Sequence, residues 1–326
     1  MKKNQLTYPI KFIPILKEKV WGGAQLKQLF NKDTNSKNVG ESWEISGVEN
    51  NVSLVENGTL QGKSLTQLIQ EFKSDLLGTK VYQEFGDTFP LLFKFIDAKE
   101  DLSVQLHPND ALAIKRHNSF GKNEMWYILN SEENGKLVLG FNQKMNKTLY
   151  KKHLSENTLS QILHSEKVKK GDAYFIETGT VHAIGAGVVL VEIQQTSDIT
   201  YRIYDYNRPG INGKLRELHA DLALEAINFK PSNPKLSFEN KVNIPIQLYK
   251  CSYFQTNKIE ITKSIHRDLK YIDSFVVYMC VEGNGTLMIN NNSEEFKKGD
   301  TLLIPAQNNS VELISNNTTI LEVYIP

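Results

Sequence analysis

Short segments in which apolar and polar positions alternate dominate this chain. Residues 5–60 contain several such segments separated by turns, and Trp43 and Ile45 alternate there with Glu44 and Ser46. Alternation of this kind is typical of strands with one buried face. Further strands are expected at 90–97, 102–108, 126–129, 136–140, 174–176, 188–194 and 200–204, and the chain beyond 234 is rich in the same pattern. The sequence therefore predicts a mainly β protein.

A few segments instead have the spacing of an α-helix. The first is expected to begin directly after Ser64, which forms a capping box with Gln67, and to end at Gly78. We expect it to pack against the core rather than to carry chemistry. A helix start is predicted at Pro108-Asn109-Asp110. Two further helices are predicted over 147–164, with a break near 155–157, and over 216–227.

An internal repeat suggests that the strands form two similar units. The segment 169–177 matches 297–305, and residues 230–234 between them have the composition of a linker. Such a repeat suits two β-barrels, each with a turn followed by a core strand. We expect domains at 1–230 and 231–326. His182 lies eleven residues after Gly171, whereas Ser310 lies eleven after Gly299, so only the first barrel is expected to hold a metal.

Polar side chains with metal-binding chemistry recur on the predicted strands of the first unit. Side chains two apart on a strand share one face, so the strands at 102–108 and 122–126 each present a set of them. Two imidazoles, a carboxylate and an amide oxygen are a plausible zinc ligand set. If these faces look into one barrel, the candidate ligands are Gln105, His107, Glu124 and His182, with Ser103 and Lys122 beside them for substrate.

Lys94 lies in the middle of the apolar run 90–97. One interpretation is an edge strand whose lysine extends to water. The other is a lysine that points into a cavity and meets a negative charge, because an unpaired buried ammonium is costly. The remaining histidines are expected to be ordinary surface or hydrogen-bonded residues: His117, His153, His164, His219 and His266.

Composition narrows the classes of function. The 326 residues are 40% hydrophobic and 23% charged, as in ordinary globular proteins, and the net charge of +1 argues against a nucleic-acid-binding surface. Cys251 and Cys280 lack metal-binding spacing and suit a reduced, intracellular protein. Prolines and Lys11 interrupt the first residues, so no signal peptide is expected, and no stretch approaches the roughly 18 apolar residues of a membrane span. We expect a cytoplasmic protein without nucleic-acid or membrane partners.

Several motifs resemble known families. One motif resembles the second conserved motif of the cupins, which are double-stranded β-helix barrels with a central metal. It consists of Gly171-Asp172, Gly179 and His182. Two positions depart from the cupin pattern: Glu177 stands in place of the usual Pro, and Ala186 in place of the frequent Asn. A larger set is similar to type I mannose-6-phosphate isomerases, in that family's order and over most of 10–230. The set comprises Trp21-Gly22-Gly23, Gly40-Glu41-Ser42-Trp43-Glu44, Ser103-Val104-Gln105-Leu106-His107-Pro108, Lys122-Asn123-Glu124 and Ser197-Asp198-Ile199-Thr200-Tyr201-Arg202. The short interval from Glu124 to His182 resembles the compact bacterial members, and the tail fits a second, metal-free cupin domain.

The resemblance assigns roles to individual residues. It implies one Zn²⁺ per chain, held by Gln105, His107, Glu124 and His182. It implies that Arg202 is the catalytic arginine, with Lys122 and Asp198 as neighbours, and that Lys94 and Ser103 bind the substrate phosphate. Asn123 stands where longer members have Pro, a change expected to alter loop stiffness more than chemistry. A structural ion pair of Arg202 with Asp198 or Asp205 is the alternative to its catalytic role.

The function expected from this resemblance is the interconversion of mannose 6-phosphate and fructose 6-phosphate through an enediol(ate). Zinc would act as a Lewis acid or a template, and Arg202 would stabilise the anionic intermediate. Three candidates stay open for the base: Asp198, Lys122 and a zinc-bound water. Rival functions are another metallo-cupin enzyme such as an oxygenase, a non-catalytic sugar-phosphate-binding protein, and an isomerase of broader sugar choice. The sequence leaves open whether the protein is a monomer or a weak dimer.

Overall fold

The computed structural model describes residues 6–231 and 233–326. The first five residues, which belong to the segment tested above for a signal peptide, and Ser232 of the predicted linker lie outside this range. Within it, no helix combines the length and the apolar character that crossing a membrane requires.

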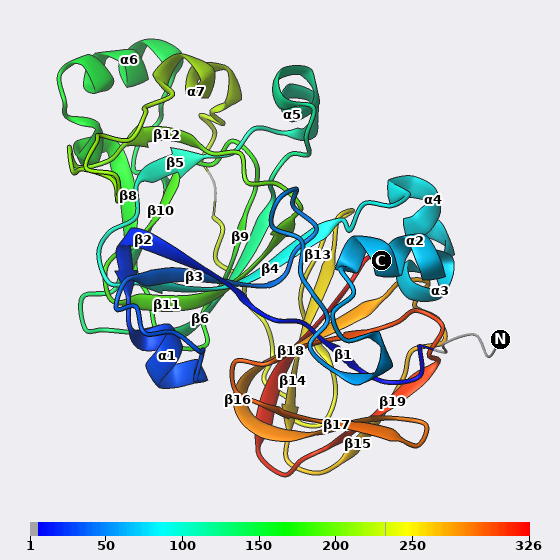
Figure 1. The fold of residues 1–326 in the computed structure, drawn as a ribbon. Helices are drawn as coiled ribbons and strands as arrows, with labels where there is room; N and C mark the ends of the chain where they lie inside the picture. The colour runs from blue at the N-terminus through cyan, green and yellow to red at the C-terminus, as the bar shows by residue number, and fades with distance from the viewer. Residues whose placement is uncertain (1–5, 232) are drawn as a thin grey trace.

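Most of the first two thirds of the chain forms two facing sheets (Figure 1). The six-stranded sheet has the order β2-β3-β4-β11-β6-β9, and the five-stranded sheet the order β12-β5-β10-β7-β8. The strands of the first are β2 (Ile15–Gly23), β3 (Val39–Ile45), β4 (Leu91–Ala98), β6 (Glu124–Ser131), β9 (Ala173–Ile176) and β11 (Val188–Gln195). Those of the second are β5 (Val104–Leu106), β7 (Lys136–Phe141), β8 (Leu163–Lys167), β10 (His182–Ile184) and β12 (Tyr201–Tyr204).

A nine-stranded sheet forms the other half of the molecule, and its main path runs β1-β18-β16-β20-β14-β13. Its strands are β1 (Ile10–Lys11), β13 (Ile246–Lys250), β14 (Gln255–Ile261), β15 (Ile265–Asp268), β16 (Val276–Ile289), β17 (Asn292–Lys297), β18 (Thr301–Ile304), β19 (Ser310–Ile314) and β20 (Thr318–Tyr324). β1 comes from the start of the chain, and Ile10 pairs with Leu303. The N-terminal segment therefore contributes a strand to the second half, across the boundary that the sequence predicted.

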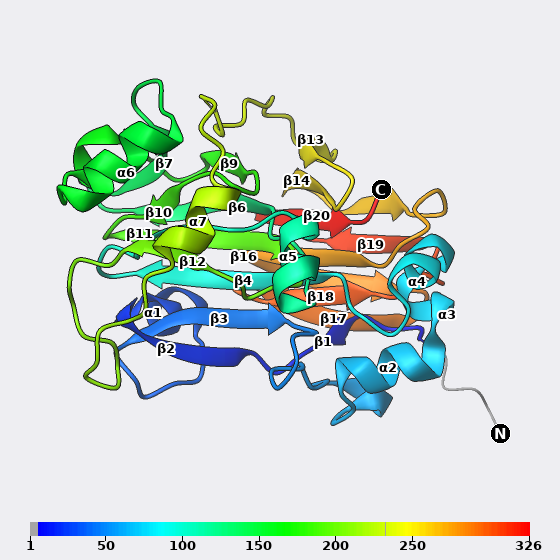
Figure 2. The ribbon, with the colours of Figure 1, turned by 90° about the horizontal axis from the view of Figure 1, so that it is seen from above.

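The mainly β architecture confirms the predicted fold class, with three open sheets in the described residues instead of two hydrogen-bonded closed barrels. The helices lie at the periphery (Figure 2). They are α1 (Gln25–Phe30), α2 (Leu65–Phe72), α3 (Ser74–Leu77), α4 (Thr79–Phe85), α5 (Asp110–His117), α6 (Lys147–Ser155) and α7 (Ala220–Ala226), with 3₁₀ turns η1 (Gly58–Leu60) and η2 (Leu159–Ile162).

The first predicted helix is confirmed at its start and divided in its middle. Ser64 and Gln67 form the expected capping box at the start of α2. Lys73 then adopts a positive φ of 50°, which separates α2 from α3. The carbonyls of Leu76 and Leu77 accept hydrogen bonds from Ala306 and Phe275 of the second half. These contacts attach the end of α3 to the second half.

The two later helices differ from prediction at one bound each: the first has the expected break after Ser155 but ends too early, and the second starts too late. The segment predicted as helix over 147–164 contains α6 and η2, and from Leu163 the chain pairs with β7 as a strand. The helix predicted over 216–227 begins only at Ala220. The side chain of Arg216 is held by Asp205, and the amide of His219 donates to the carbonyl of Arg202, so this stretch lies along β12 instead. In both cases tertiary hydrogen bonds override local helical preference.

The predicted internal repeat is confirmed in backbone detail. Gly171 and Gly299 have positive φ of 91° and 93°, a conformation that favours glycine. The Asp172 carboxylate accepts from the Lys169 amide and that of Asp300 from the Lys297 amide, both at 3.1 Å. The two turns therefore start β9 and β18 in the same way.

Four clusters of buried apolar side chains surround these sheets, and one of them joins β5, α6 and α7 through Leu106, Tyr150 and Ala223. Between the six- and five-stranded sheets lie Ile96, Trp126, Leu137 and Ile184. On the opposite face of the six-stranded sheet, Phe93 and Val191 pack in one core with Val277 and Leu321 of the second half. A third core fills the second half itself. The space between the first two sheets holds the polar cluster described next.

Candidate active site and metal centre

Strand register brings the predicted metal ligands together. Gln105 on β5 pairs directly with His182 on β10, and His107 follows β5 by one residue. Glu124 begins β6 in the facing sheet. The potential ligand atoms of His107, Glu124 and His182 all lie within 4.8 Å of one another, and the three side chains are buried. The sequence prediction that these three residues converge is therefore correct.

Backbone contacts orient both imidazoles toward this cluster. Nδ1 of His107 lies 2.8 Å from the carbonyl of Ile199, and Nδ1 of His182 lies 2.9 Å from the carbonyl of Thr180. A carbonyl only accepts, so Nδ1 carries the hydrogen and Nε2 presents its lone pair to the cluster. Burial lowers the pKa of both rings, that of His182 to about 3. Both histidines are therefore neutral near pH 7, which is the form that binds metals.

Glu124 supplies the negative charge of the cluster. Burial alone would raise its pKa, but Lys122 and the two histidines hold the pKa well below the ordinary value, so the carboxylate is ionised. Its Oε2 atom is buried without a hydrogen-bond partner and lies 3.8 Å from Nε2 of His182. An unpartnered buried carboxylate oxygen is costly, and a cation bound between it and the two imidazoles would remove that cost. The cluster therefore fits a metal ion.

Gln105 and Lys122 complete the surroundings of this cluster. Nε2 of Gln105 lies 3.5 Å from Nε2 of His182, and its Oε1 accepts from Ser103 at 3.3 Å. The amide therefore presents its nitrogen to the cluster, and a half-turn of the amide would present the oxygen instead. The Lys122 ammonium contacts Oε1 of Glu124 and lies 3.1 Å from Nε2 of His107. Lys122 thus compensates the Glu124 charge directly.

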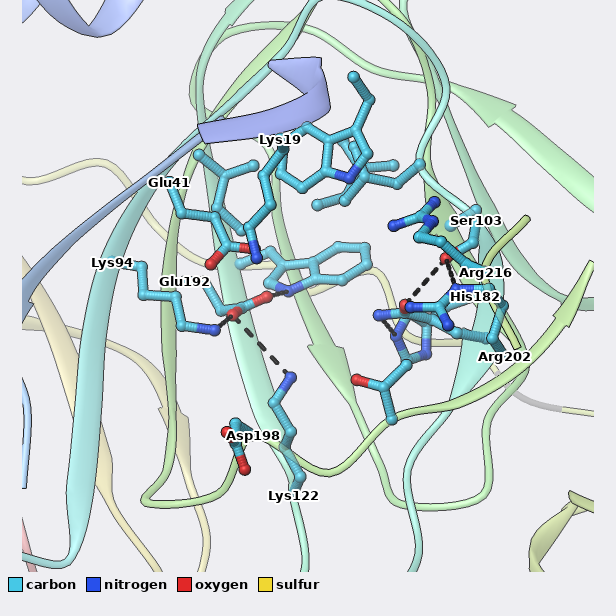
Figure 3. Close-up of a pocket in the computed structure, with 18 of the residues that line it drawn as sticks. Lys19, Glu41, Lys94, Ser103, Lys122, His182, Glu192, Asp198, Arg202 and Arg216 are labelled. Carbon is cyan, nitrogen blue, oxygen red and sulfur yellow. Dashed lines mark hydrogen bonds and ion pairs between the residues drawn. The ribbon is translucent and has the colours of Figure 1, made fainter. Parts of the chain in front are cut away.

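One pocket adjoins the metal cluster, and Lys94, Lys122, Glu192, Asp198 and Arg202 line it (Figure 3). Lys94 is buried and does not extend to solvent. Its Nζ donates to Glu192 at 2.8 Å and to Gln194 at 2.7 Å. Burial would lower the pKa of Lys94, but Glu192 and Glu41 raise it above the ordinary value. The structure therefore supports the second of the two interpretations of Lys94, in which it meets a negative charge inside a cavity.

The opposite side of the pocket carries Ser103, Arg202 and Arg216 (Figure 3). Nε of Arg202 donates to the Ser103 hydroxyl at 3.2 Å, and Nη1 donates to the carbonyl of Glu217 at 3.0 Å. Burial and the nearby Arg216 charge lower the pKa of Arg202. Asp205 pairs with Arg216 and Arg208, which leaves the Arg202 guanidinium bound to neutral acceptors. This second cationic wall faces the Lys94 wall across the pocket.

Sequence reasoning missed three charged residues of the pocket. Lys19 and Glu41 line it and pair at 3.2 Å on the neighbouring strands β2 and β3. In the sequence, Glu41 is visible only as part of the motif Gly40-Glu41-Ser42-Trp43-Glu44. Arg216 lies at the start of the segment 216–227, which the sequence incorrectly predicts to be helical throughout. Its place after an irregular segment rich in glycine and charge, where loops carry binding residues, is the only signal that could have identified it.

Comparisons with known proteins agree with this geometry. Residues 10–166 match the family model "Phosphomannose isomerase type I, catalytic domain", and residues 246–325 match "Mannose-6-phosphate isomerase, cupin domain". The chain is 37% identical over 304 residues to mannose-6-phosphate isomerase ManA of Bacillus subtilis, covering 92% of this chain and 93% of the relative. It is 31% identical to mannose-6-phosphate isomerase of Streptococcus mutans, over 88% of this chain and 89% of that one.

Solved structures show the same fold. The crystal structure of mannose 6-phosphate isomerase from Bacillus subtilis matches with a TM-score of 0.89 at 33% identity, covering 98% of this chain and all of that chain. A putative mannosephosphate isomerase from Archaeoglobus fulgidus matches with a TM-score of 0.79 at 22% identity, over 97% of this chain and 98% of that one, and shows the fold alone. From the matched models, the identity to full-length relatives and the convergent histidines and glutamate, we conclude that this chain belongs to the type I phosphomannose isomerase family.

Proposed function

We propose that this protein is a zinc-dependent isomerase that interconverts mannose 6-phosphate and fructose 6-phosphate. One observation carries the proposal: the His107–Glu124–His182 cluster adjoins a pocket lined by lysine and arginine side chains. Such a pocket suits a small anionic substrate that also reaches a metal. The relatives from Bacillus subtilis and Streptococcus mutans bear the name of this activity.

The metal would be held by His107, Glu124 and His182, with Gln105 as a fourth ligand after rotation of its amide. Two neutral imidazoles and one carboxylate are a common ligand set for catalytic zinc. When bound, the ion would act as a Lewis acid that favours negative charge on the sugar oxygens. All three principal ligands are buried, and His182 also lines the pocket, so the ion would lie at its inner end.

The isomerisation moves one proton between C2 and C1 of the open-chain sugar through an enediol(ate). Arg202 would stabilise the developing oxyanion, because its guanidinium stays cationic and its known partners are neutral acceptors. We propose Asp198, exposed at the pocket, as the base that removes and returns the proton. Lys122 is the alternative base. A carboxylate accepts a proton directly, whereas an ammonium must first lose one.

The phosphate would be bound by Lys94 and Ser103. These residues belong to the two facing sheets, on β4 and just before β5. An ammonium has three donors, and Glu192 and Gln194 use two of those on Lys94. The third is available to a phosphate oxygen, and the Ser103 hydroxyl could reach another. Binding energy from the phosphate would then orient the sugar chain toward the metal.

A coupled assay with mannose 6-phosphate, run beside free mannose and glucose 6-phosphate, tests this function. We expect turnover of mannose 6-phosphate, loss of activity after chelation and recovery on adding zinc. Activity that survives verified metal removal would exclude a catalytic metal. Turnover of free mannose with equal kcat/KM would exclude the phosphate site.

Asp198→Asn and Lys122→Met separate the two side chains among the candidate bases, and a small loss of kcat in both variants would favour the third candidate, a zinc-bound water. If Asp198 is the base, Asp198→Asn loses about 10²–10⁴-fold in kcat, the usual contribution of a positioned general base, while zinc content is unchanged. A larger loss for Lys122→Met with zinc retained would assign the base to Lys122.

A further inference from the structure

A hydrogen-bonded network next to the metal cluster centres on Asn123, which is not among the residues that line the pocket. This residue follows Lys122 and precedes Glu124, and it is 6% exposed. Its backbone amide and its Nδ2 both donate to Oε1 of Gln195, at 3.0 and 2.8 Å. Its Oδ1 accepts from the amide of Thr178 at 3.0 Å. Asn123 therefore binds the end of β11 and the loop that leads to His182.

Asp110 extends the network to the third ligand-bearing segment. Its Oδ1 accepts from the amide of Gly121 at 2.8 Å and from Nε2 of Gln195 at 3.1 Å. Asp110 begins α5, three residues after His107. The carbonyl of His107 in turn accepts from the amide of Gly179 at 2.8 Å. The segments that carry His107, Glu124 and His182 are thus fixed to one another by hydrogen bonds that involve no ligand side chain.

The second half of the molecule closes this network. Tyr253, in the turn between β13 and β14, donates its hydroxyl to Oδ2 of Asp110. This turn belongs to the region, residues 246–325, that matches the family model of the cupin domain. The backbones of Gly121 and Asp110 are packed closely together: a Cβ atom on residue 121 would lie only 2.7 Å from the backbone nitrogen of Asp110. Asp110 therefore receives hydrogen bonds from both halves of the molecule at one carboxylate.

We propose that Asn123, Gln195, Asp110 and Tyr253 are positioning residues for the metal centre, and that the second half contributes to metal affinity through the Tyr253 hydroxyl. None of the four is proposed to touch the ion or the sugar. They set the distances between the three ligand segments, and the chelate geometry follows from those distances. This inference rests on the proposed metal site, but not on which sugar is the substrate.

Tyr253→Phe and Asn123→Ala test the proposal in the full chain. The affinity for Zn²⁺ is measured by competition with a chromophoric chelator, a readout that requires no turnover. Tyr253→Phe keeps the ring and removes only the hydroxyl, so the fold is retained. We expect zinc affinity to fall about tenfold in Tyr253→Phe and by about 10–100-fold in Asn123→Ala, as for other residues that orient metal ligands. Tyr271→Phe, at a side chain that is 87% exposed in the same half, is the matched control.

Steady-state kinetics provide a second readout. At saturating zinc we expect kcat to fall while KM for mannose 6-phosphate stays within about twofold, because the phosphate-binding residues are untouched. Zinc affinities of both variants within twofold of the parent would overturn the proposal, as would a parent protein that binds no zinc. A parent that binds zinc but does not isomerise mannose 6-phosphate would refute the proposed function only. The affinities of the two variants would then still decide the positioning role.

Discussion

Lys94 and Glu192 occupy directly opposed positions on the neighbouring strands β4 and β11, and Nζ of the lysine lies 2.8 Å from Oε1 of the glutamate. Both side chains are buried, at 5% and 4% exposure. The other glutamate oxygen accepts from the Trp126 indole at 3.1 Å. The pair therefore holds charge inside the space between the two sheets, where an uncompensated charge would be strongly destabilising.

Lys94→Met tests the contribution of Lys94 to stability and to phosphate binding. The variant removes the nearer cation of buried Glu192 and leaves Lys122, at 4.0 Å, as the other, so we expect the free energy of unfolding to fall by about 3 kcal/mol. Urea unfolding followed by circular dichroism measures this loss. The kinetic expectation is a raised KM for mannose 6-phosphate. Lys99→Met, at an exposed position just beyond the end of β4, should change neither quantity appreciably. An unchanged KM for Lys94→Met would argue against its phosphate role.

Metal binding should stabilise the folded protein. An ion that binds only the native state adds about 2.7 kcal/mol when its free concentration is 100 times Kd. For a chain of this size we expect Tm to rise by roughly 4 °C on adding zinc to chelator-treated protein. His182→Ala should abolish this rise, and His153→Ala, outside the cluster, should retain it. A full rise in His182→Ala would mean that the ion binds elsewhere.

Glu41 should contribute to stability in a defined pH range. Burial alone would raise its pKa, but Lys19, Lys94 and the Trp43 indole lower it from 4.5 to about 2. Because the folded-state pKa lies below the unfolded-state value, this stabilisation is fully present above about pH 4.5 and is lost as pH falls toward 2. The shift corresponds to about 3 kcal/mol as an order of magnitude.

The Glu41→Gln variant should therefore lose stability at pH 7 and show a shallower decrease between pH 5 and 3 than the parent protein. Urea midpoints across this range provide the measurement. Glu49→Gln, at an exposed position, should follow the parent curve. Parallel curves for Glu41→Gln and the parent would show that Glu41 does not titrate in the way described.

Glu322 in the second half corresponds to Glu192 in the first, and its carboxylate should require its cationic partner for stability. Ile128 and Cys280 make equivalent backbone hydrogen bonds to the two repeated turns. Two residues before them, Trp126 pairs in register with Glu192, and Tyr278 pairs with Glu322. Glu322 is fully buried and accepts from Arg267, Tyr278 and Asn257, each at 2.9 Å.

Arg267→Met would leave the Glu322 carboxylate without its cation. We expect a loss of about 3–5 kcal/mol in unfolding free energy, measured by urea titration. Zinc affinity should stay within about twofold, since Arg267 lies outside the metal cluster and the network around Asn123. Arg267→Met with parental stability would show that the ion pair is dispensable. A large drop in zinc affinity in the folded variant would show that this network also acts on the metal centre.

Local sequence signals determined much of this protein. Alternation of apolar and polar residues predicted the strands, because every second side chain on a strand faces the core. The capping box at Ser64 and the repeated turns at Gly171 and Gly299 were predictable for the same local reason. The convergence of His107, Glu124 and His182 followed from motif spacing and from the resemblance to a known family, and the structure brings these atoms within 4.8 Å of one another.

Only the tertiary structure decided the remaining features, which depend on residues far apart in the chain. The pairing of β1 with β18 joins Ile10 to Leu303, and no local pattern specifies such a partner. Arg216 reaches the pocket because Asp205 draws its segment away from a helix. The contact of Tyr253 with Asp110 joins residues 143 positions apart. Sequence periodicity specifies which face of an element is buried, whereas the identity of the opposing side chain depends on how the folded sheets pack.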